Sequence, residues 1–138
     1  MFSPKGIFAL ELKDWQGFIY GPKDDEYWTV GYKNEQNRSA KQVYSPYKQN
    51  ERHIEDLNNV YPSPYYINHV IFSERGNIGE GMEDVTKLEG FYARYKQLEN
   101  CMDVVDINEH YQAIRSKLNP DKLPDHIERI KFNQAKYR

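Results

Sequence analysis

The sequence predicts an α/β fold in which a mixed central sheet is flanked by helices. Two apolar segments, residues 6–13 and 65–72, have the length and side-chain character of strands buried in a sheet. Between them, residues 18–44 show the short, turn-separated segments of an antiparallel meander, and residues 46–59 have the apolar spacing of a helix. Together these strands and helices place the chain in the α/β class.

The composition is that of a folded domain with a very polar surface. Of the 138 residues, 38% are hydrophobic and 29% are charged, yet 14% are aromatic, with twelve tyrosines. Disordered chains are poor in aromatic residues, so we expect a globular domain whose core relies on Tyr and Phe. The length suits one domain, and we predict a single domain over residues 1–138.

Local signals define the elements of the first half of the chain. Strands are expected at residues 18–20, 27–30 and 42–44. Ser45 and Pro46 are typical of a helix start, with Ser45 as N-cap and Pro46 where its missing N–H costs nothing. A helix from Pro46 to about Asn59 would carry on one stripe Tyr47, Asn50, Ile54 and Leu57, and on the neighbouring stripe Gln49, His53 and Asp56.

The second half of the chain is predicted mainly from apolar spacing. The Gly-rich segment there lacks the Gly-Lys-Ser/Thr ending that grips a nucleotide phosphate, so it is interpreted as a flexible loop. The expected elements are a core strand over 65–72, this loop over 75–81, a helix over 83–98, a last strand over 102–105, a helix over 108–118 and a basic helix from Pro124 onward.

The charge balance limits how the chain can contact nucleic acid. A net charge of −2 gives no global attraction to phosphates, so any contact with DNA must be local. The candidates around the predicted helix are Lys41, Lys48 and Arg52. The second candidate is the stretch 115–138, which holds seven basic and three acidic side chains, although we favour its interpretation as the solvated surface of a helix. Aromatic residues that could stack on bases are Trp15, Tyr20 and Trp28, although for the two tryptophans core packing is the interpretation we favour.

Several classes of protein are excluded by what the sequence lacks. Cys101 is the one cysteine, so an intrachain disulfide and a thiolate metal cluster are impossible. The four histidines lack the close spacing of a zinc site, and no Gly-x-Ser-x-Gly motif supports a nucleophilic hydrolase. No segment is apolar enough to cross a bilayer, and we expect a cytoplasmic protein.

The most informative pattern is Glu11-Leu12-Lys13 at the end of the first predicted strand. Because strand side chains alternate, Glu11 and Lys13 lie on one face, together with Ile7 and Ala9. A carboxylate and an ammonium placed in this way can hold a metal ion and a water molecule. The alternative interpretation is a surface ion pair, which contributes little to stability.

A series of landmarks extends over about half of the chain. In order they are Lys5-Gly6-Ile7-Phe8, Glu11-Leu12-Lys13, Trp15-Gln16-Gly17-Phe18-Ile19-Tyr20-Gly21, Tyr27-Trp28-Thr29, Ser45-Pro46-Tyr47-Lys48-Gln49-Asn50, His53-Ile54 and Val70-Ile71-Phe72-Ser73. In this order they resemble the NERD family, the nuclease-related domain.

The resemblance implies a restriction-endonuclease-like fold and a Mg²⁺- or Mn²⁺-dependent phosphodiesterase that acts on DNA. It implies that Glu11 binds the metal ion together with the carbonyl of Leu12, and that Lys13 contacts the scissile phosphate or helps to deprotonate water. Gln49 is implied to orient a phosphate or the attacking water; from the residues alone, a surface or capping glutamine fits equally well. His53 is interpreted as a packed or exposed side chain rather than a base.

The chain also departs from the family pattern, which includes an aspartate on a strand before the Gly-Ile-Phe segment. Because the sequence begins five residues before Gly6, we expect a partial active site with weakened metal binding. Asp14 is predicted on the opposite strand face and cannot replace this aspartate. Three explanations stay open: a shortened chain, which we favour, a degenerate nuclease serving as a nucleic-acid or protein interaction module, and an aspartate supplied by another chain in a homo-oligomer or by a partner.

Overall fold

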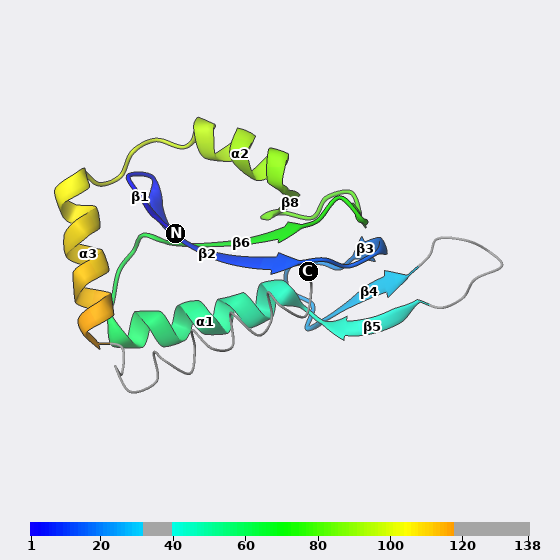
Figure 1. Cartoon of the computed structure of the whole chain (residues 1–138). Coiled ribbons are helices and arrows are strands. Elements are labelled where there is room, and N and C mark those ends of the chain that lie inside the picture. The colour runs from blue at the N-terminus through cyan, green and yellow to red at the C-terminus, as the bar shows by residue number, and fades with distance from the viewer. Residues whose placement is uncertain (32–39, 118–138) are drawn as a thin grey trace, which may run out of the picture.

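The computed structural model describes residues 1–31 and 40–117, and in this part of the chain eight strands form two four-stranded sheets accompanied by three helices (Figure 1). The architecture is mixed α/β and is consistent with a restriction-endonuclease-like fold, so the predicted fold class is confirmed. The division of the strands between two sheets is a feature that the sequence did not indicate.

The first sheet is built around two long parallel strands, β2 (Gly6–Lys13) and β6 (Tyr66–Phe72). The short strand β1 (Phe2–Ser3) runs antiparallel to β2, and β8 (Val85–Lys87) runs parallel to β6 on the other side. The strand order is therefore β1-β2-β6-β8. Its two central strands are the two apolar segments from which the sheet was predicted.

The second sheet contains the predicted antiparallel meander. Gly17 starts β3 (Gly17–Tyr20) with a φ of +95°, and a Cβ there would lie 2.7 Å from the carbonyl oxygen of Gly31, the last residue of β4 (Tyr27–Gly31). A glycine is therefore required where β3 and β4 meet. The parallel strand β7 extends the sheet beyond the meander. In spatial order the strands are β5 (Lys41–Tyr44), β4 (Tyr27–Gly31), β3 (Gly17–Tyr20) and β7 (Gly76–Ile78).

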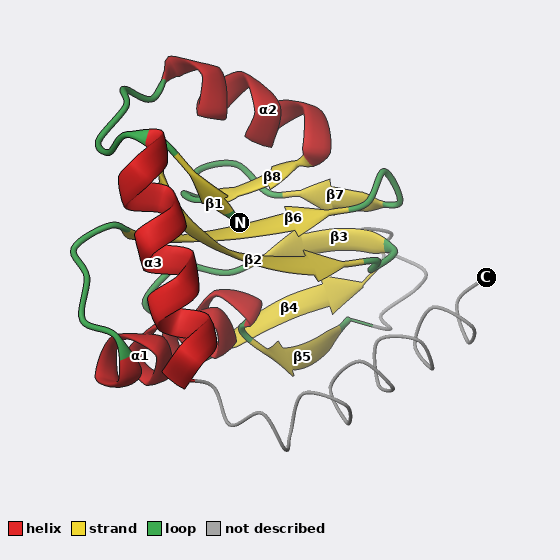
Figure 2. Cartoon of the chain, turned by 60° about the vertical axis from the view of Figure 1, so that its left-hand side comes forward, coloured by secondary structure: helices red, strands yellow, loops and turns green. Residues whose placement is uncertain are grey.

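Helices lie on both faces of the first sheet, as Figures 1 and 2 show. Helix α1 (Pro46–Val60) covers one face, α2 (Leu88–Gln97) lies on the opposite face, and α3 (Val104–Lys117) packs against β1 and the end of α1. As predicted, Ser45 caps α1, because its Oγ accepts a hydrogen bond from the backbone N–H of Lys48 at 3.1 Å. None of the helices in the described residues is long and apolar enough to cross a membrane.

Strand β6 separates two apolar clusters, because its successive side chains point to opposite faces. Val70 and Phe72 join a larger cluster that unites both sheets with α1, whereas Ile71 joins a smaller cluster beneath α2. The buried members of the larger cluster are Ile19, Trp28, Val30, Tyr47, Val70, Phe72 and Val85, and those of the smaller cluster are Phe8, Ile71 and Phe91.

Two predictions for the second half of the chain are wrong because pairing with distant strands overrides the local pattern. The predicted loop over 75–81 contains β7, which pairs with β3. The predicted helix over 83–98 begins as strand β8, and helical turns start only at Leu88. Val85 fits a helical spacing, but in the structure it pairs with Val70 inside the first sheet.

Residues 102–105 do not form the predicted last strand. Met102 is buried in a bend, and α3 begins at Val104 rather than at residue 108. Asp103 accounts for the early start, because its Oδ1 accepts a hydrogen bond from the backbone N–H of Asp106 at 2.9 Å, as an N-cap does. The predicted basic helix from Pro124 onward lies outside the described residues.

His69 of β6 is a buried titratable group in the first sheet. His69 is 2% exposed, and its Nε2 atom lies 2.8 Å from Oγ1 of Thr86 in β8. The pKa of His69 is lowered to about 4, mainly by burial and in addition by the charge of Arg94, while the charge of Asp84 acts in the opposite direction. The fold therefore holds the imidazole in its neutral form.

We expect the free energy of unfolding to fall by about 1–2 kcal/mol between pH 7 and pH 5 because of His69. A pKa below the ordinary value of 6.5 in the folded state means that the unfolded chain binds more protons, so the stabilisation is present above pH 6.5 and is lost as the pH falls toward 4. Urea unfolding at both pH values measures this loss. His69→Gln should lack this component, and an unchanged pH dependence in that variant would contradict the assignment.

Candidate active site

Strand β2 places Glu11 and Lys13 on the face that points toward the larger apolar cluster. In the parallel register Glu11 lies opposite Val70, and Lys13 lies opposite Phe72. Register partners in a sheet direct their side chains to the same face, and both partners are buried members of that cluster. Leu12, between the two, is 69% exposed. The predicted alternation of the strand therefore holds at its end.

Glu11 and Lys13 form an ion pair, with 3.2 Å between Oε1 and Nζ. The side chains are only 18% and 24% exposed, respectively, so this pair is more enclosed than an ordinary surface pair. The Nζ atom of Lys13 also lies 5.8 Å from the centroid of the Trp15 ring, within the range of a cation–π contact. Glu11, Lys13 and Trp15 thus follow one another along the same side of the chain.

Helix α1 is attached to β2 and β6 by a pair of amide side chains, the buried Asn50 and the half-buried Asn68. The Nδ2 atom of Asn50 donates to the carbonyl of Ala9 at 2.5 Å and to Oδ1 of Asn68 at 2.8 Å. Asn68 in turn donates to the carbonyl of Tyr47 at 3.0 Å. These bonds hold the start of α1 against Ala9, two residues before Glu11.

Gln49 directly precedes Asn50 and is half-buried, so the structure brings it to the same end of α1. Among the residues that the structure describes, no hydrogen bond joins the side chain of Gln49 to Glu11 or Lys13. On the neighbouring stripe of the helix, His53 is exposed. The predicted role of Gln49 stays a prediction, and the geometry assigns none to His53.

The three cations predicted to contact nucleic acid have different surroundings. Lys48 forms a 3.3 Å ion pair with Glu51, so a carboxylate already lies beside its ammonium. The guanidinium of Arg52 lies 5.2 Å from the centroid of the Tyr44 ring. Lys41, on β5, lines a cavity, and within the described part of the chain no carboxylate lies within ion-pairing distance of its ammonium. Lys41 and Arg52 are therefore the better placed of the three to meet a phosphate.

The two tryptophans of the chain have different environments. Trp28 is 1% exposed and donates its Nε1–H to the carbonyl of Pro22 at 3.0 Å, so it is a core residue as predicted. Trp15 packs on Phe72 but is only half-buried, and it lines the same cavity as Lys41. Sequence reasoning missed this cavity, because its walls come from segments that are separate in the chain; the nearest signal is the position of Trp15, two residues after Lys13.

The oxygen donors around Glu11 are compatible with a divalent metal ion. The carbonyl of Lys13 accepts a hydrogen bond from the backbone N–H of Ser73, the residue after β6. The backbone groups of the odd-numbered residues of β2 therefore point toward β6, and the carbonyl of Leu12 points away from β6. On that side of β2, strand β1 pairs only with Gly6 and Ile7 and does not reach Leu12. Carboxylate and carbonyl oxygens suit Mg²⁺ and Mn²⁺. The described residues hold no cluster of three His, Cys, Asp or Glu side chains, so these two donors make a partial shell.

Asp14 does not join Glu11. Its Oδ1 accepts from Oγ of Ser73 at 2.5 Å, and its Oδ2 lies 3.2 Å from Arg75. The hydrogen bond from Ser73 and the charge of Arg75 lower the pKa of Asp14, while desolvation acts in the opposite direction. The carboxylate is thus held away from the ion pair by its own partners.

The family model described as nuclease-related domain, NERD, matches residues 1–73, slightly more than half of the chain. The matched part runs from β1 to β6 and contains Glu11, Lys13 and Gln49. Comparison with curated proteins and with solved structures gave no match. With this match over more than half of its length, the chain belongs to the nuclease-related domain family.

Proposed function

We propose that this domain contributes to a divalent-metal-dependent phosphodiesterase that acts on DNA, with Glu11 and Lys13 as its catalytic pair. The observation that carries the proposal is the 3.2 Å pair itself, held at the end of a buried strand and largely enclosed by the fold. An enclosed carboxylate beside an ammonium, in a family of nuclease-related domains, favours phosphodiester chemistry over a role in stability alone.

Each residue of the pair has a distinct task. Glu11, with the carbonyl of Leu12, would hold Mg²⁺ or Mn²⁺. Such an ion supplies a water molecule of lowered pKa and polarises the phosphoryl oxygens. The ammonium of Lys13 stabilises the negative charge that develops on the phosphate, and Gln49 on α1 orients the phosphate or the attacking water through its amide group. Binding of Lys13 to a phosphate would draw its Nζ partly away from Glu11.

The proposal is tested by nicking of supercoiled DNA in the presence of Mg²⁺ or Mn²⁺. We expect Glu11→Gln and Lys13→Met each to lower the rate by roughly 100-fold or more, because each removes a charge that the transition state requires. Glu74→Gln is the matched control, since Glu74 forms a 3.3 Å ion pair with Lys87 but is far more exposed. No metal-dependent nicking, or equal rates in all four proteins, would remove the enzymatic claim.

A second candidate function is a nucleic-acid interaction module without cleavage. It is favoured by Lys41 and Arg52, exposed cations that have no carboxylate partner among the described residues. For this function, DNA binding should weaken with salt but should be unaffected by EDTA and by Glu11→Gln. Loss of binding in either condition would contradict it.

A further inference from the structure

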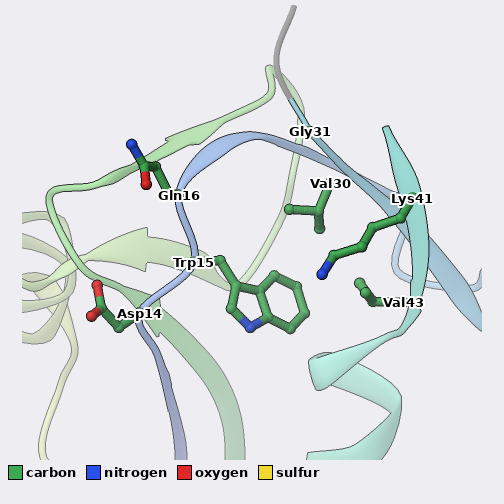
Figure 3. Close-up of a pocket in the computed structure, with 7 residues that line it drawn as sticks. All are labelled: Asp14, Trp15, Gln16, Val30, Gly31, Lys41 and Val43. Atoms are coloured by element: carbon green, nitrogen blue, oxygen red, sulfur yellow. The ribbon is translucent and has the colours of Figure 1, made fainter. Parts of the chain in front are cut away.

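A cavity of about 450 Å³ lies between the turn that follows β2 and the strands β4 and β5, and its wall begins at Asp14, the residue after Lys13. Its volume is within the range of small-ligand sites, which is about 300–1,000 Å³. Figure 3 shows the residues that line it, namely Asp14, Trp15, Gln16, Val30, Gly31, Lys41 and Val43.

The indole of Trp15 forms one wall of this cavity and is held in place from behind. Its ring packs against Phe72, with 5.4 Å between the ring centroids and 49° between the planes. Val30 and Val43 provide apolar surface opposite, and Figure 3 shows them on the same side of the indole. A fixed aromatic ring that faces apolar walls across an open space suits a flat, hydrophobic ligand group.

Of the two charged residues that line the cavity, the cation faces its interior and the anion does not. Lys41 extends toward the indole, whereas the carboxylate of Asp14 turns away from it (Figure 3). Asp14 is engaged by Ser73 and Arg75, and the amide oxygen of Gln16 accepts from Arg75 at 3.0 Å. The ammonium of Lys13 lies 5.8 Å from the centroid of the Trp15 ring. Two ammonium groups, those of Lys41 and Lys13, therefore lie near the aromatic wall.

We propose that this cavity is a subsite for an unpaired base of a DNA strand, which stacks on Trp15 while Lys41 and Lys13 contact the phosphates on either side of that nucleotide. Stacking on an aromatic side chain combined with cations along the backbone is how single strands are bound. The proposal deepens the proposed function and rests on it in one respect, since Lys13 would share its phosphate with the cleavage site.

The subsite selects unpaired bases for a geometric reason. Within a duplex both faces of a base are covered by its neighbours, so a base must leave the stack before it can lie on an indole. The substrate class that follows is a single strand, or a duplex with a flap, gap or extruded nucleotide next to the scissile phosphate.

The test measures intrinsic fluorescence during titration with short strands in EDTA, where no cleavage occurs. Trp28 is 1% exposed, so quenching by acrylamide reports mainly on Trp15, the other of the two tryptophans. A single-stranded oligothymidylate should quench Trp15 and shield it from acrylamide. An abasic strand of equal length carries the same phosphates, so it should bind but leave Trp15 accessible.

Two variants separate stacking from charge. Trp15→Ala should lower the affinity for oligothymidylate by roughly 5- to 150-fold and leave the affinity for the abasic strand unchanged. Lys41→Gln should weaken binding of both strands, whereas Lys87→Gln, which removes a lysine already paired with Glu74, should not. Because the abasic comparison is made within each protein, a general loss of folding cannot imitate this pattern.

Three results would overturn the subsite: equal shielding by the abasic strand, equal quenching by a blunt duplex, or binding of thymidine monophosphate as tight as that of the strand. The last result would indicate a free-nucleotide site. Failure of the two proposals can also be told apart. Quenching without any metal-dependent nicking would remove the phosphodiesterase and leave the subsite, whereas nicking without quenching would remove the subsite alone.

Discussion

Replacement of Phe72 by alanine is expected to lower the free energy of unfolding by about 3–5 kcal/mol. Phe72 is 1% exposed, belongs to the larger apolar cluster and lies opposite Lys13 in the first sheet. Removal of its ring leaves a void where the two sheets and α1 meet, and it also takes away the surface on which Trp15 rests. Urea unfolding followed by circular dichroism measures the loss.

Leu12→Ala is the matched control for this experiment. Leu12 is also a large apolar residue at the end of a strand of the same sheet, but it is 69% exposed. Its replacement should change the free energy of unfolding by no more than about 0.5 kcal/mol. Losses of similar size in the two variants would show that Phe72 is not the buried centre that the structure describes.

Gly21→Ala is expected to cost about 3 kcal/mol for a steric reason. A Cβ at this position would overlap the Cδ1 and Cγ atoms of Trp28. The indole cannot move aside freely, since it is 1% exposed and its Nε1–H is bonded to the carbonyl of Pro22. The midpoint of urea unfolding measures the cost.

Two further variants identify the cause. Gly81 has a φ of +74°, and apart from its chain neighbours no atom of the described residues lies within 4 Å of the position that a Cβ would take there. Gly81→Ala therefore isolates the backbone cost of losing a glycine, about 1 kcal/mol. In a Trp28→Leu background the effect of Gly21→Ala should shrink, because the clashing ring is gone. Additive effects of Gly21→Ala and Trp28→Leu would refute the proposed clash.

The elements that could be predicted from the sequence are those whose signals are local. Ser45 and Pro46 mark the start of α1 because a side-chain acceptor and a missing N–H are both favourable in the first turn. The alternation that places Glu11 and Lys13 together is equally local, since residues two apart in a strand share a face. For the same reason their short separation could be expected, although their degree of enclosure could not.

The elements that could not be predicted depend on distant partners. Val85 takes a strand conformation because Val70 is beside it, and the backbone of Gly76 to Ile78 is extended because β3 offers hydrogen bonds. The cavity is also a product of the tertiary structure, since it joins Trp15, in the turn after β2, to Lys41 on β5 of the second sheet. No spacing along the chain reports such a juxtaposition.

The amide pair of Asn50 and Asn68 has a consequence for how firmly the candidate site is set. Asn50 is 2% exposed, and its bonds fit only one position of α1 along β2 and β6. A slip of the helix by one turn would leave the buried amide of Asn50 without partners, at a cost of about 1–3 kcal/mol, and would also break the bonds of the half-buried Asn68. The amide pair therefore fixes the position of α1 along the two strands, and with it the distance between Gln49 and the end of β2.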